Sequence, residues 1–214
     1  MSFRHLCRIA LLIIVGLSVA GCFAPDFTYV ADSSDSAYFK VPPSWHEVSE
    51  SSLAAVEGQS GSQGTYLWSR AYDAAVTPSV THVFASSQKP VAYASVLGLS
   101  TSERGGVSFN SMRDLLLPVT QTARNAASAA HVPLTGFTSL SDEVITNSHN
   151  DRGIREIFAY NLNGIPETFD LTVMTNSSTT KVYFLLVHCN DGCFVANYPE
   201  IEKVVGSFTV GGGS

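Results

Sequence analysis

The chain has 214 residues, of which 45% are hydrophobic and 14% are charged, so it can bury a core and is not a wholly disordered chain. Its formal net charge is −6, and two of its 12 basic residues, Arg4 and Arg8, stand near the N-terminus. The remainder is more acidic still and contains no lysine- or arginine-rich run. This excludes nucleic acid as an expected partner, because phosphate binding needs a positive patch.

The first 22 residues have the pattern of a lipoprotein export signal. A basic stretch with Arg4 and Arg8 precedes an apolar stretch, 9–20, which fits a signal-peptide core and is too short to span a bilayer. Val19-Ala20-Gly21-Cys22 then resembles a lipobox, in which the leader is cut before a cysteine that carries lipid on its thiol. The alternative is an ordinary secretory signal followed by an accidental cysteine.

This pattern divides the chain into four parts. We expect residues 1–21 to be a signal peptide, residues 22–26 to be the lipidated Cys22 with a short tether, residues 27–210 to form one globular domain, and residues 211–214 to be a flexible tail. The acyl chains on Cys22 would hold the domain on the extracytoplasmic face of a cell membrane. Whether that is the inner or the outer membrane stays open if the organism has two.

The first half of the domain begins with a predicted hairpin, formed by strands at Phe27–Ala31 and Ala37–Val41 around a polar turn. Pro42-Pro43 ends it, and Trp45 follows. Ser49 would cap a short helix, Ser49–Val56, with Leu53 and Val56 facing inward. Further strands are predicted at Thr65–Ala71, Ser79–Ala85 and Val91–Leu99.

A polar loop, Ser100–Gly106, leads into a helical stretch that reaches about Ala130. Its apolar residues recur on one face, and Pro118 is expected to split or kink it because proline cannot donate the helical hydrogen bond. Four strands follow with short polar turns, which predicts antiparallel hairpins. They are Phe137–Asn147, Arg152–Leu162, Glu167–Asn176 and Thr180–Cys189.

Two of these strands have informative patterns. In Glu167–Asn176, apolar residues alternate with Thr168, Asp170 and Thr172, so one face should be buried and the other partly wet. In Thr180–Cys189 both faces are apolar, which predicts a central strand covered on each side.

The C-terminal helix is predicted from Asn197 as N-cap, with Pro199 in its first turn and Gly206 at its end. Just before it, Cys189 and Cys193 are expected to form a disulfide, since an isolated cysteine pair in an exported protein is most simply a structural staple. The intervening Asn-Asp-Gly would supply the tight turn that the bond needs. A Cys-x-x-Cys redox motif and a zinc-ligand pattern are both absent from this pair.

The order of elements has a familiar layout. A first hairpin running into Phe39-Lys40-Val41-Pro42-Pro43-Ser44-Trp45, an antiparallel meander and a closing helix resemble the superfamily that contains photosystem II PsbP and the Ran-binding Mog protein. Lipid-anchored actinobacterial members, the LpqN-type lipoproteins, are similar in placing a lipobox before the domain. The resemblance implies an α+β fold, an α/β/α sandwich with a central, mainly antiparallel sheet, and a binding or assembly role with no catalytic residues to carry over.

Candidate binding residues are few. Trp45 could line a groove, Glu103 and Arg104 stand in a loop that could contact a partner, and His149 with Asp151 could hold a metal or move a proton. Each also has a plain structural explanation, namely core packing for Trp45, a solvated loop for the pair, and a hairpin tip for His149 and Asp151. Further candidates for lining a groove are Tyr66, Trp68 and Tyr93, for which core packing is the alternative. His188 is a candidate metal ligand, and the alternative is a histidine at a strand end near the disulfide.

The sequence therefore supports ranked hypotheses. The first is a non-catalytic surface lipoprotein that binds or positions an envelope protein, with no cofactor and no metal. The second is a lipid or small-molecule carrier with a pocket between sheet and helices. The third is an unrecognised hydrolase, although the sequence contains no Gly-x-Ser-x-Gly elbow and no His-Glu-x-x-His motif.

Overall fold

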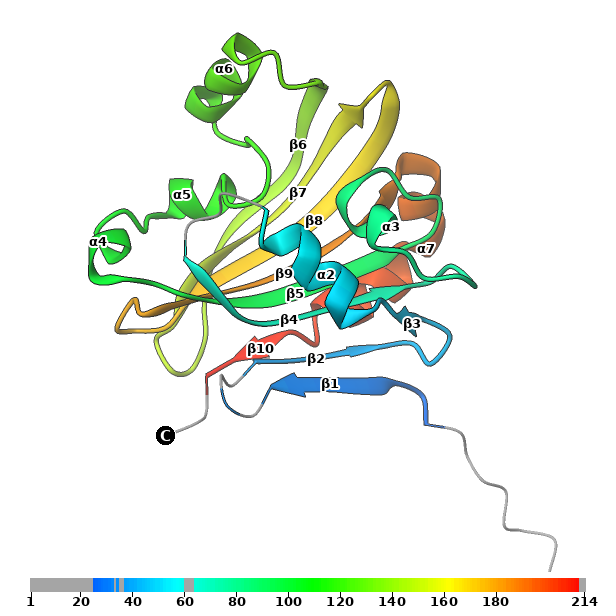
Figure 1. Ribbon diagram of the computed structural model, residues 1–214, viewed down its shortest axis with the longest axis horizontal. Helices are drawn as coiled ribbons and strands as arrows, with labels where there is room; N and C mark the ends of the chain where they lie inside the picture. The colour runs from blue at the N-terminus through cyan, green and yellow to red at the C-terminus, as the bar shows by residue number, and fades with distance from the viewer. Residues whose placement is uncertain (1–24, 33, 35–36, 60–63, 212–214) are drawn as a thin grey trace, which may run out of the picture.

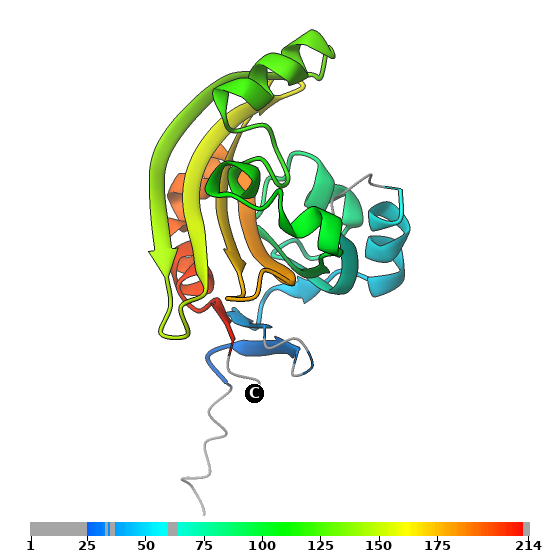
Figure 2. The ribbon, with the colours of Figure 1, turned by 90° about the vertical axis from the view of Figure 1, so that its left-hand side faces the viewer.

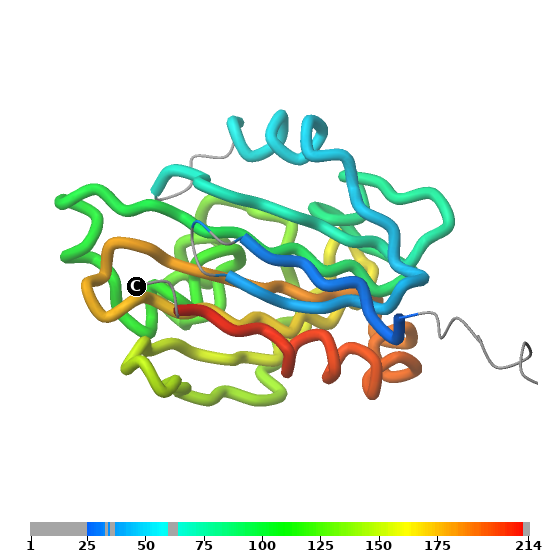
Figure 3. Tube along the Cα trace, turned by 90° about the horizontal axis from the view of Figure 1, so that it is seen from below, coloured from blue at the N-terminus to red at the C-terminus, as the bar shows by residue number. Residues whose placement is uncertain are grey.

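The computed structural model describes residues 25–32, 34, 37–59 and 64–211, which contain two antiparallel sheets (Figure 1). The smaller sheet is built from both ends of the chain. Strands β1 (Thr28–Asp32) and β2 (Ala37–Val41) form the predicted hairpin, with Thr28 opposite Val41. The C-terminal strand β10 (Thr209–Val210) pairs with the other edge of β2, so the two ends of the domain lie side by side (Figure 3).

The larger sheet has seven strands in the order β3-β4-β5-β9-β8-β7-β6, and every neighbouring pair is antiparallel. The strands are β3 (His46–Glu47), β4 (Thr65–Asp73), β5 (Val91–Gly98), β6 (Leu134–Thr146), β7 (Arg152–Leu162), β8 (Ile165–Thr175) and β9 (Lys181–Asn190). The predicted meander of hairpins is confirmed. Strand β9, which carries apolar residues on both faces, is the central one, as expected for a strand buried on both sides.

The helices cover both faces of this sheet. They are α2 (Glu50–Glu57), α3 (Val80–Phe84), α4 (Thr101–Arg104), α5 (Phe109–Arg113), α6 (Gln121–Ala129) and α7 (Asp191–Val205). Helix α7 and the three-stranded sheet lie on one face of the large sheet, and the other helices lie on the opposite face. The β6–β7 end of the large sheet curves toward these other helices (Figure 2). The sandwich is confirmed, with one outer layer that combines a helix and a small sheet. No helix in the described ranges is both long and apolar enough to cross a bilayer.

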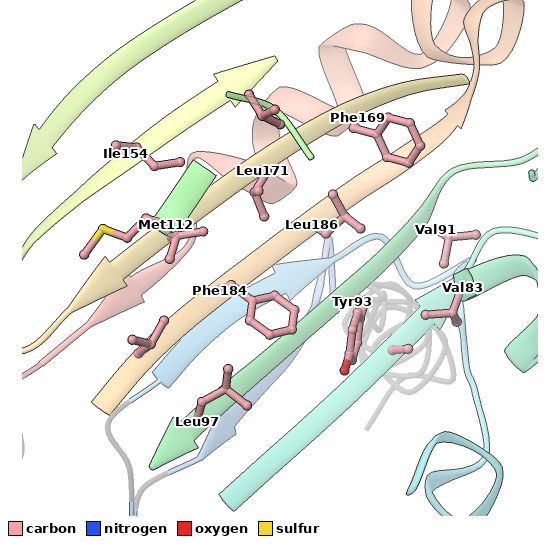
Figure 4. Packing of buried hydrophobic residues seen from close by; sticks show 14 of the residues in the cluster. Val83, Val91, Tyr93, Leu97, Met112, Ile154, Phe169, Leu171, Phe184 and Leu186 are labelled. Atoms are coloured by element: carbon pink, nitrogen blue, oxygen red, sulfur yellow. The ribbon is translucent and has the colours of Figure 1, made fainter. Parts of the chain in front are cut away.

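Two main cores result from this arrangement. On the α2–α6 side, buried side chains from five central strands pack together, among them Tyr93, Phe184 and Leu186 (Figure 4). The rings of Tyr93 and Phe184 meet edge to face with their centroids 5.0 Å apart. On the α7 side, Phe39 of β2 and Ile201 of α7 are completely buried against the same sheet.

The strand predicted at Ser79–Ala85 is wrong, because this segment forms helix α3. The Ser79 hydroxyl accepts the Thr81 backbone N–H and caps the helix. The buried carboxylate of Asp73, at the end of β4, accepts the Ser79 N–H and lies 2.6 Å from Nδ1 of His82. These polar contacts with β4, which alternation of apolar residues cannot reveal, favour a helical turn over an extended segment.

The expectation of a partly wet face on β8 is also wrong. Thr168, Asp170 and Thr172 are all buried, because α7 and the side chain of Arg155 cover them. The Thr168 hydroxyl donates to Asp191 at the start of α7 over 2.6 Å. Asp170 is fully buried and accepts two hydrogen bonds from the Arg155 guanidinium, 3.0 and 2.6 Å long. Burial raises the pKa of Asp170, while Arg155 opposes that rise.

Helix α7 begins earlier than predicted. Its N-cap is Asn190, whose side chain accepts the Cys193 N–H over 2.9 Å, and Asn197 and Pro199 lie inside the helix. The Asn-Asp-Gly segment expected to be a tight turn is therefore the first helical turn. This geometry also brings the Cα atoms of Cys189 and Cys193 to 5.9 Å, which is compatible with a disulfide. The predicted end at Gly206 is confirmed.

The predicted break near Pro118 is confirmed. Helix α5 ends at Arg113 and α6 begins at Gln121, after a turn of three leucines. The Asp114 carboxylate accepts the backbone N–H groups of Val119 and Thr120 over 2.8 and 2.7 Å. The polar loop expected at Ser100–Gly106 contains one helical turn, α4, which a capping box between Ser100 and Glu103 stabilises.

Candidate ligand-binding site

A pocket of about 700 Å³ opens between the seven-stranded sheet and three segments that cover it, namely α3, the α5–α6 connection and the α6–β6 connection. Its floor is formed by side chains of the central strands, including Phe169 of β8 and Leu186 of β9. Its walls are formed by three surrounding segments: residues 83–86, 115–117 and 132–134. Most of the lining is aliphatic or aromatic, and the volume lies within the range of small-molecule sites.

The rim of the pocket exposes large apolar side chains. Phe84, Val132 and Ile165 line the pocket, and 46%, 42% and 48% of their surfaces are exposed to solvent. They come from three separate segments, namely α3, the α6–β6 connection and the start of β8. Apolar residues that converge on one opening favour a ligand that covers them.

One wall of the pocket carries a polar cluster around the fully buried carboxylate of Glu167. Ser86 Oγ donates to Glu167 Oε2 over 2.7 Å, and the Ser87 N–H donates to Oε1 over 3.1 Å. His188 is also buried, with Nδ1 2.8 Å from Glu167 Oε1 and Nε2 3.2 Å from the carbonyl oxygen of Val83. Because a carbonyl oxygen only accepts, Nε2 carries a hydrogen. Ser86 and His188 line the pocket and give an otherwise apolar wall a polar point.

This cluster is not arranged as a hydrolytic triad. In a triad the imidazole lies between the nucleophilic hydroxyl and the carboxylate, so that it can take the hydroxyl proton. Here the carboxylate of Glu167 lies between Ser86 and His188, and the second imidazole nitrogen faces a backbone carbonyl. The arrangement orders the α3 side of the pocket, and the imidazole of His188 makes no hydrogen bond to Ser86.

A second polar group lies at the β4–β5 side of the pocket. The Tyr93 hydroxyl donates to the Glu57 carboxylate over 2.9 Å, and burial raises the pKa of Tyr93. Tyr66 of β4 also lines the pocket. Two of the aromatic residues proposed from the sequence as groove residues, Tyr66 and Tyr93, therefore do line the site, whereas Trp68 packs against the core on the α7 side.

Trp45 lies away from this pocket. It packs in the core between β2, the large sheet and α7, is 3% exposed, and donates its indole N–H to Glu200 over 2.9 Å. Trp45, which follows Pro42-Pro43-Ser44, therefore serves packing, and its side chain is almost completely covered.

Glu103 and Arg104 stabilise their own loop. The Glu103 carboxylate accepts the N–H groups of Ser100 and Gly64, 2.7 and 2.8 Å away. A hydrogen bond with the Ser100 side chain, together with these two backbone bonds, lowers the pKa of Glu103. Arg104 reaches the carbonyl of Leu99 over 3.4 Å. Glu103 thus joins α4 to the segment before β4, Arg104 joins it to the residue after β5, and neither residue lines the pocket.

His149 and Asp151 form the tip of the β6–β7 hairpin. Asp151 is buried and accepts hydrogen bonds from Asn147 and from the Ser177 N–H, 3.0 and 3.1 Å long, while His149 is exposed. Within the described ranges, no group of three His, Cys, Asp or Glu side chains is placed to hold a metal ion. Cys22, with the leader, lies outside the described residues.

Sequence reasoning missed most of the pocket lining. Leu115 and Leu116 were predicted to lie on one apolar face of a helix that Pro118 kinks or splits, and Ser86 and Glu167 carried no motif. The break at Pro118 was the available signal, because it takes these leucines out of regular helix. His188 was noted only as a metal candidate or a strand-end residue, and its partner Glu167 lies 21 positions away.

Fold and pocket together define a class of protein: an α+β sandwich with an apolar, partly open pocket beside its central sheet. Among solved structures the chain is similar to the cyanobacterial PsbP of Synechocystis sp. PCC 6803, with a TM-score of 0.54, 11% identity, and coverage of 92% of this chain and 99% of that one. The chain therefore has a PsbP-like fold. No protein-family model and no curated protein matches the sequence.

Two further solved structures are similar at lower scores. One is LpqN of Mycobacterium tuberculosis, described as involved in cell envelope biogenesis, with a TM-score of 0.46, 16% identity, and coverage of 87% of this chain and 91% of that one. The other is the Ran-binding protein Mog1p of Saccharomyces cerevisiae, with a TM-score of 0.44, 7% identity, and coverage of 87% and 96%.

Proposed function

We propose that this protein is a non-catalytic binding lipoprotein of the cell envelope, and that the pocket beside β8 and β9 holds a ligand with an apolar chain. The observation that carries the proposal is the pocket itself, about 700 Å³ in volume and lined mainly by aliphatic and aromatic side chains. The alternative carrier hypothesis from the sequence required such a cavity. We therefore favour the carrier hypothesis over the hypothesis of a general assembly role, which ranked first on the sequence.

The chemistry of the lining supports a ligand of mixed character. An aliphatic chain would replace water against Phe169, Leu186 and the leucines of 115–117, which is favourable because it removes apolar surface from water. The Ser86 hydroxyl already donates its proton to Glu167, so it can only accept from the ligand. A head group that donates a hydrogen bond fits this wall better than a carboxylate, which the nearby Glu167 disfavours.

Binding can be tested with a dansyl-labelled undecyl chain, followed by dansyl fluorescence. The chain should bind to the wild-type protein, and Leu116→Trp, which fills the pocket from its wall, should weaken binding at least about tenfold, equivalent to 1.4 kcal/mol. Leu140→Trp is the matched control, since Leu140 is 59% exposed on β6 and outside this pocket. Equal affinity for all three proteins, or none for the wild type, would contradict the proposal.

The anchor is a separate part of the proposal and rests on the lipobox-like Val19-Ala20-Gly21-Cys22 and on the LpqN-type layout of the sequence. Cys22→Ser should remove the acylation site, so the variant should leave the detergent phase and appear in soluble or unprocessed form. Two or three acyl chains are expected to hold the wild-type protein in the membrane fraction. Cys7→Ser is the matched control and should stay with the membrane, because residue 7 lies in the expected leader. Membrane retention of Cys22→Ser would disprove lipid anchoring at that thiol.

A further inference from the structure

A second hollow, distinct from the ligand pocket, lies on the opposite face of the sheet. It has a volume of about 530 Å³ and runs between helix α7 and the last two strands, β7 and β6. Its apolar lining includes Leu140 of β6 and Val195 and Tyr198 of α7. These side chains are 59%, 77% and 43% exposed, so three large apolar residues meet solvent in one groove. We call this hollow the α7 groove.

Strand β6 forms the outer border of the α7 groove and is the last strand of the sheet. It pairs with β7 on one side, and no other described strand pairs with its second edge. After the irregularity between Ser139 and Ser141, the register with β7 is regular as far as Thr146. Such an edge presents N–H and C=O groups that can pair with a further strand. Lysine and proline, which commonly protect edge strands, do not occur in β6.

The charges of the α7 groove are mainly negative. Glu143 of β6 and Glu202 of α7 line it, whereas Asp142, the preceding residue on the edge strand, is paired with Arg113 over 2.8 Å and does not line the groove. The one basic residue of the lining, Arg155, is engaged by the buried Asp170 and by Glu202. A partner therefore meets a lining of net negative charge, because Glu143 and Glu202 outnumber one arginine that is already paired, and this favours basic side chains on that partner.

We propose that the α7 groove binds an extended, basic segment of another protein, which adds to β6 as a further strand and places apolar side chains against Leu140, Val195 and Tyr198. Main-chain hydrogen bonds to the edge would supply affinity, and the alternate side chains would supply specificity. A second copy of this chain fits poorly, because antiparallel pairing of two β6 strands would bring together two edges that both carry Glu143. The groove thus matches a protein partner of opposite charge.

A displayed library of random peptides, each about ten residues long to match an ordinary strand, provides the probe. Selection on the detergent-solubilised full chain should enrich sequences in which lysine or arginine alternates with branched or aromatic residues. An enriched peptide is then synthesised and titrated against the wild-type protein and two variants. Its affinity for Glu143→Lys and for Val195→Asp should be about tenfold lower than for the wild type, equivalent to 1.4 kcal/mol. Glu50→Lys, an equal charge change on helix α2, is the control and should leave binding unchanged.

Hydrogen exchange gives a second readout, which should show slower exchange of β6 amides in the peptide complex. Failure of the library to enrich any sequence, enrichment of acidic sequences, or binding that Glu143→Lys and Val195→Asp leave intact would overturn the proposal. Loss of binding with Leu116→Trp would also overturn it, because that result places the peptide in the ligand pocket. Analytical ultracentrifugation would instead assign this face to a second copy of the chain if it showed concentration-dependent dimers whose formation Glu143→Lys changes.

Discussion

Replacing Gly153 by alanine should destabilise the folded protein by about 3 kcal/mol, at the upper end of the cost of overpacking a core. Gly153 is buried on β7, next to the β6–β7 hairpin, and pairs with Met174 of β8. A Cβ atom there would lie 2.0 Å from the carbonyl oxygen of Val173 and 2.9 Å from the Cα atom of Met174. Both are backbone atoms of the adjacent strand, so no side-chain rotation can relieve the overlap and the strands must separate.

The measurement is urea unfolding followed by far-ultraviolet circular dichroism, comparing unfolding midpoints at equal m-value. Gly105→Ala is the matched control, since a Cβ atom at Gly105 meets nothing within 4 Å and its φ of −66° suits any residue. That variant should keep or slightly raise stability, because alanine restricts the unfolded chain. Equal midpoints for Gly153→Ala and the wild type would show that β7 and β8 do not pack this closely at Gly153.

The stability of the protein should fall between about pH 4.5 and pH 7, and Glu156→Gln should remove that part of the dependence. Glu156 on β7 is 3% exposed, and its Oε2 atom has no hydrogen-bond partner among the described residues. The pKa of Glu156 is raised from an ordinary 4.5 to about 7, mainly by burial and in part by the negative charge of Asp142. Arg113 opposes this rise, with its Nε atom 3.7 Å from Oε2 of Glu156.

The sign follows from proton binding. Between these two pKa values the folded state retains a proton on Glu156 that the unfolded state has released, so unfolding becomes easier as the pH rises. Each tenfold difference in proton affinity between the two states corresponds to about 1.4 kcal/mol, which puts the loss by pH 8 at up to roughly 3 kcal/mol. Glu156→Gln cannot ionise, so it should match the wild type near pH 4 and exceed its free energy of unfolding by about 2 kcal/mol at pH 8.

Urea unfolding at a series of pH values checks this prediction. Glu143→Gln is the matched control, because Glu143 is an exposed glutamate on the neighbouring strand β6. It should retain the wild-type dependence. An unchanged slope in Glu156→Gln would mean that other groups cause the fall in stability.

The residue pattern alone determined the architecture in several places. The alternation and turn residues of 152–190 predicted strands β7, β8 and β9 to within a residue or two, since a period of two and short polar turns leave little choice for antiparallel hairpins. Apolar residues on both faces of β9 correctly predicted a central strand, because a strand covered on each side excludes polar residues from most positions. Pro118 divided the helical stretch as expected, because its missing N–H acts locally.

Tertiary structure decided the rest, because those features depend on residues far apart in the chain. The buried carboxylate of Glu167 binds Ser86, Ser87 and His188, which lie 81, 80 and 21 positions away in the sequence, so the polar wall of the pocket could not be foreseen. The buried carboxylate of Asp73 binds Ser79 and His82, six and nine positions away, and without that contact α3 could be taken for a strand. The polar face of β8 was expected to be wet because the pattern does not show that α7 covers it. A sequence records which side chains are apolar, whereas a pocket and a groove depend on which surfaces remain uncovered after the layers pack together.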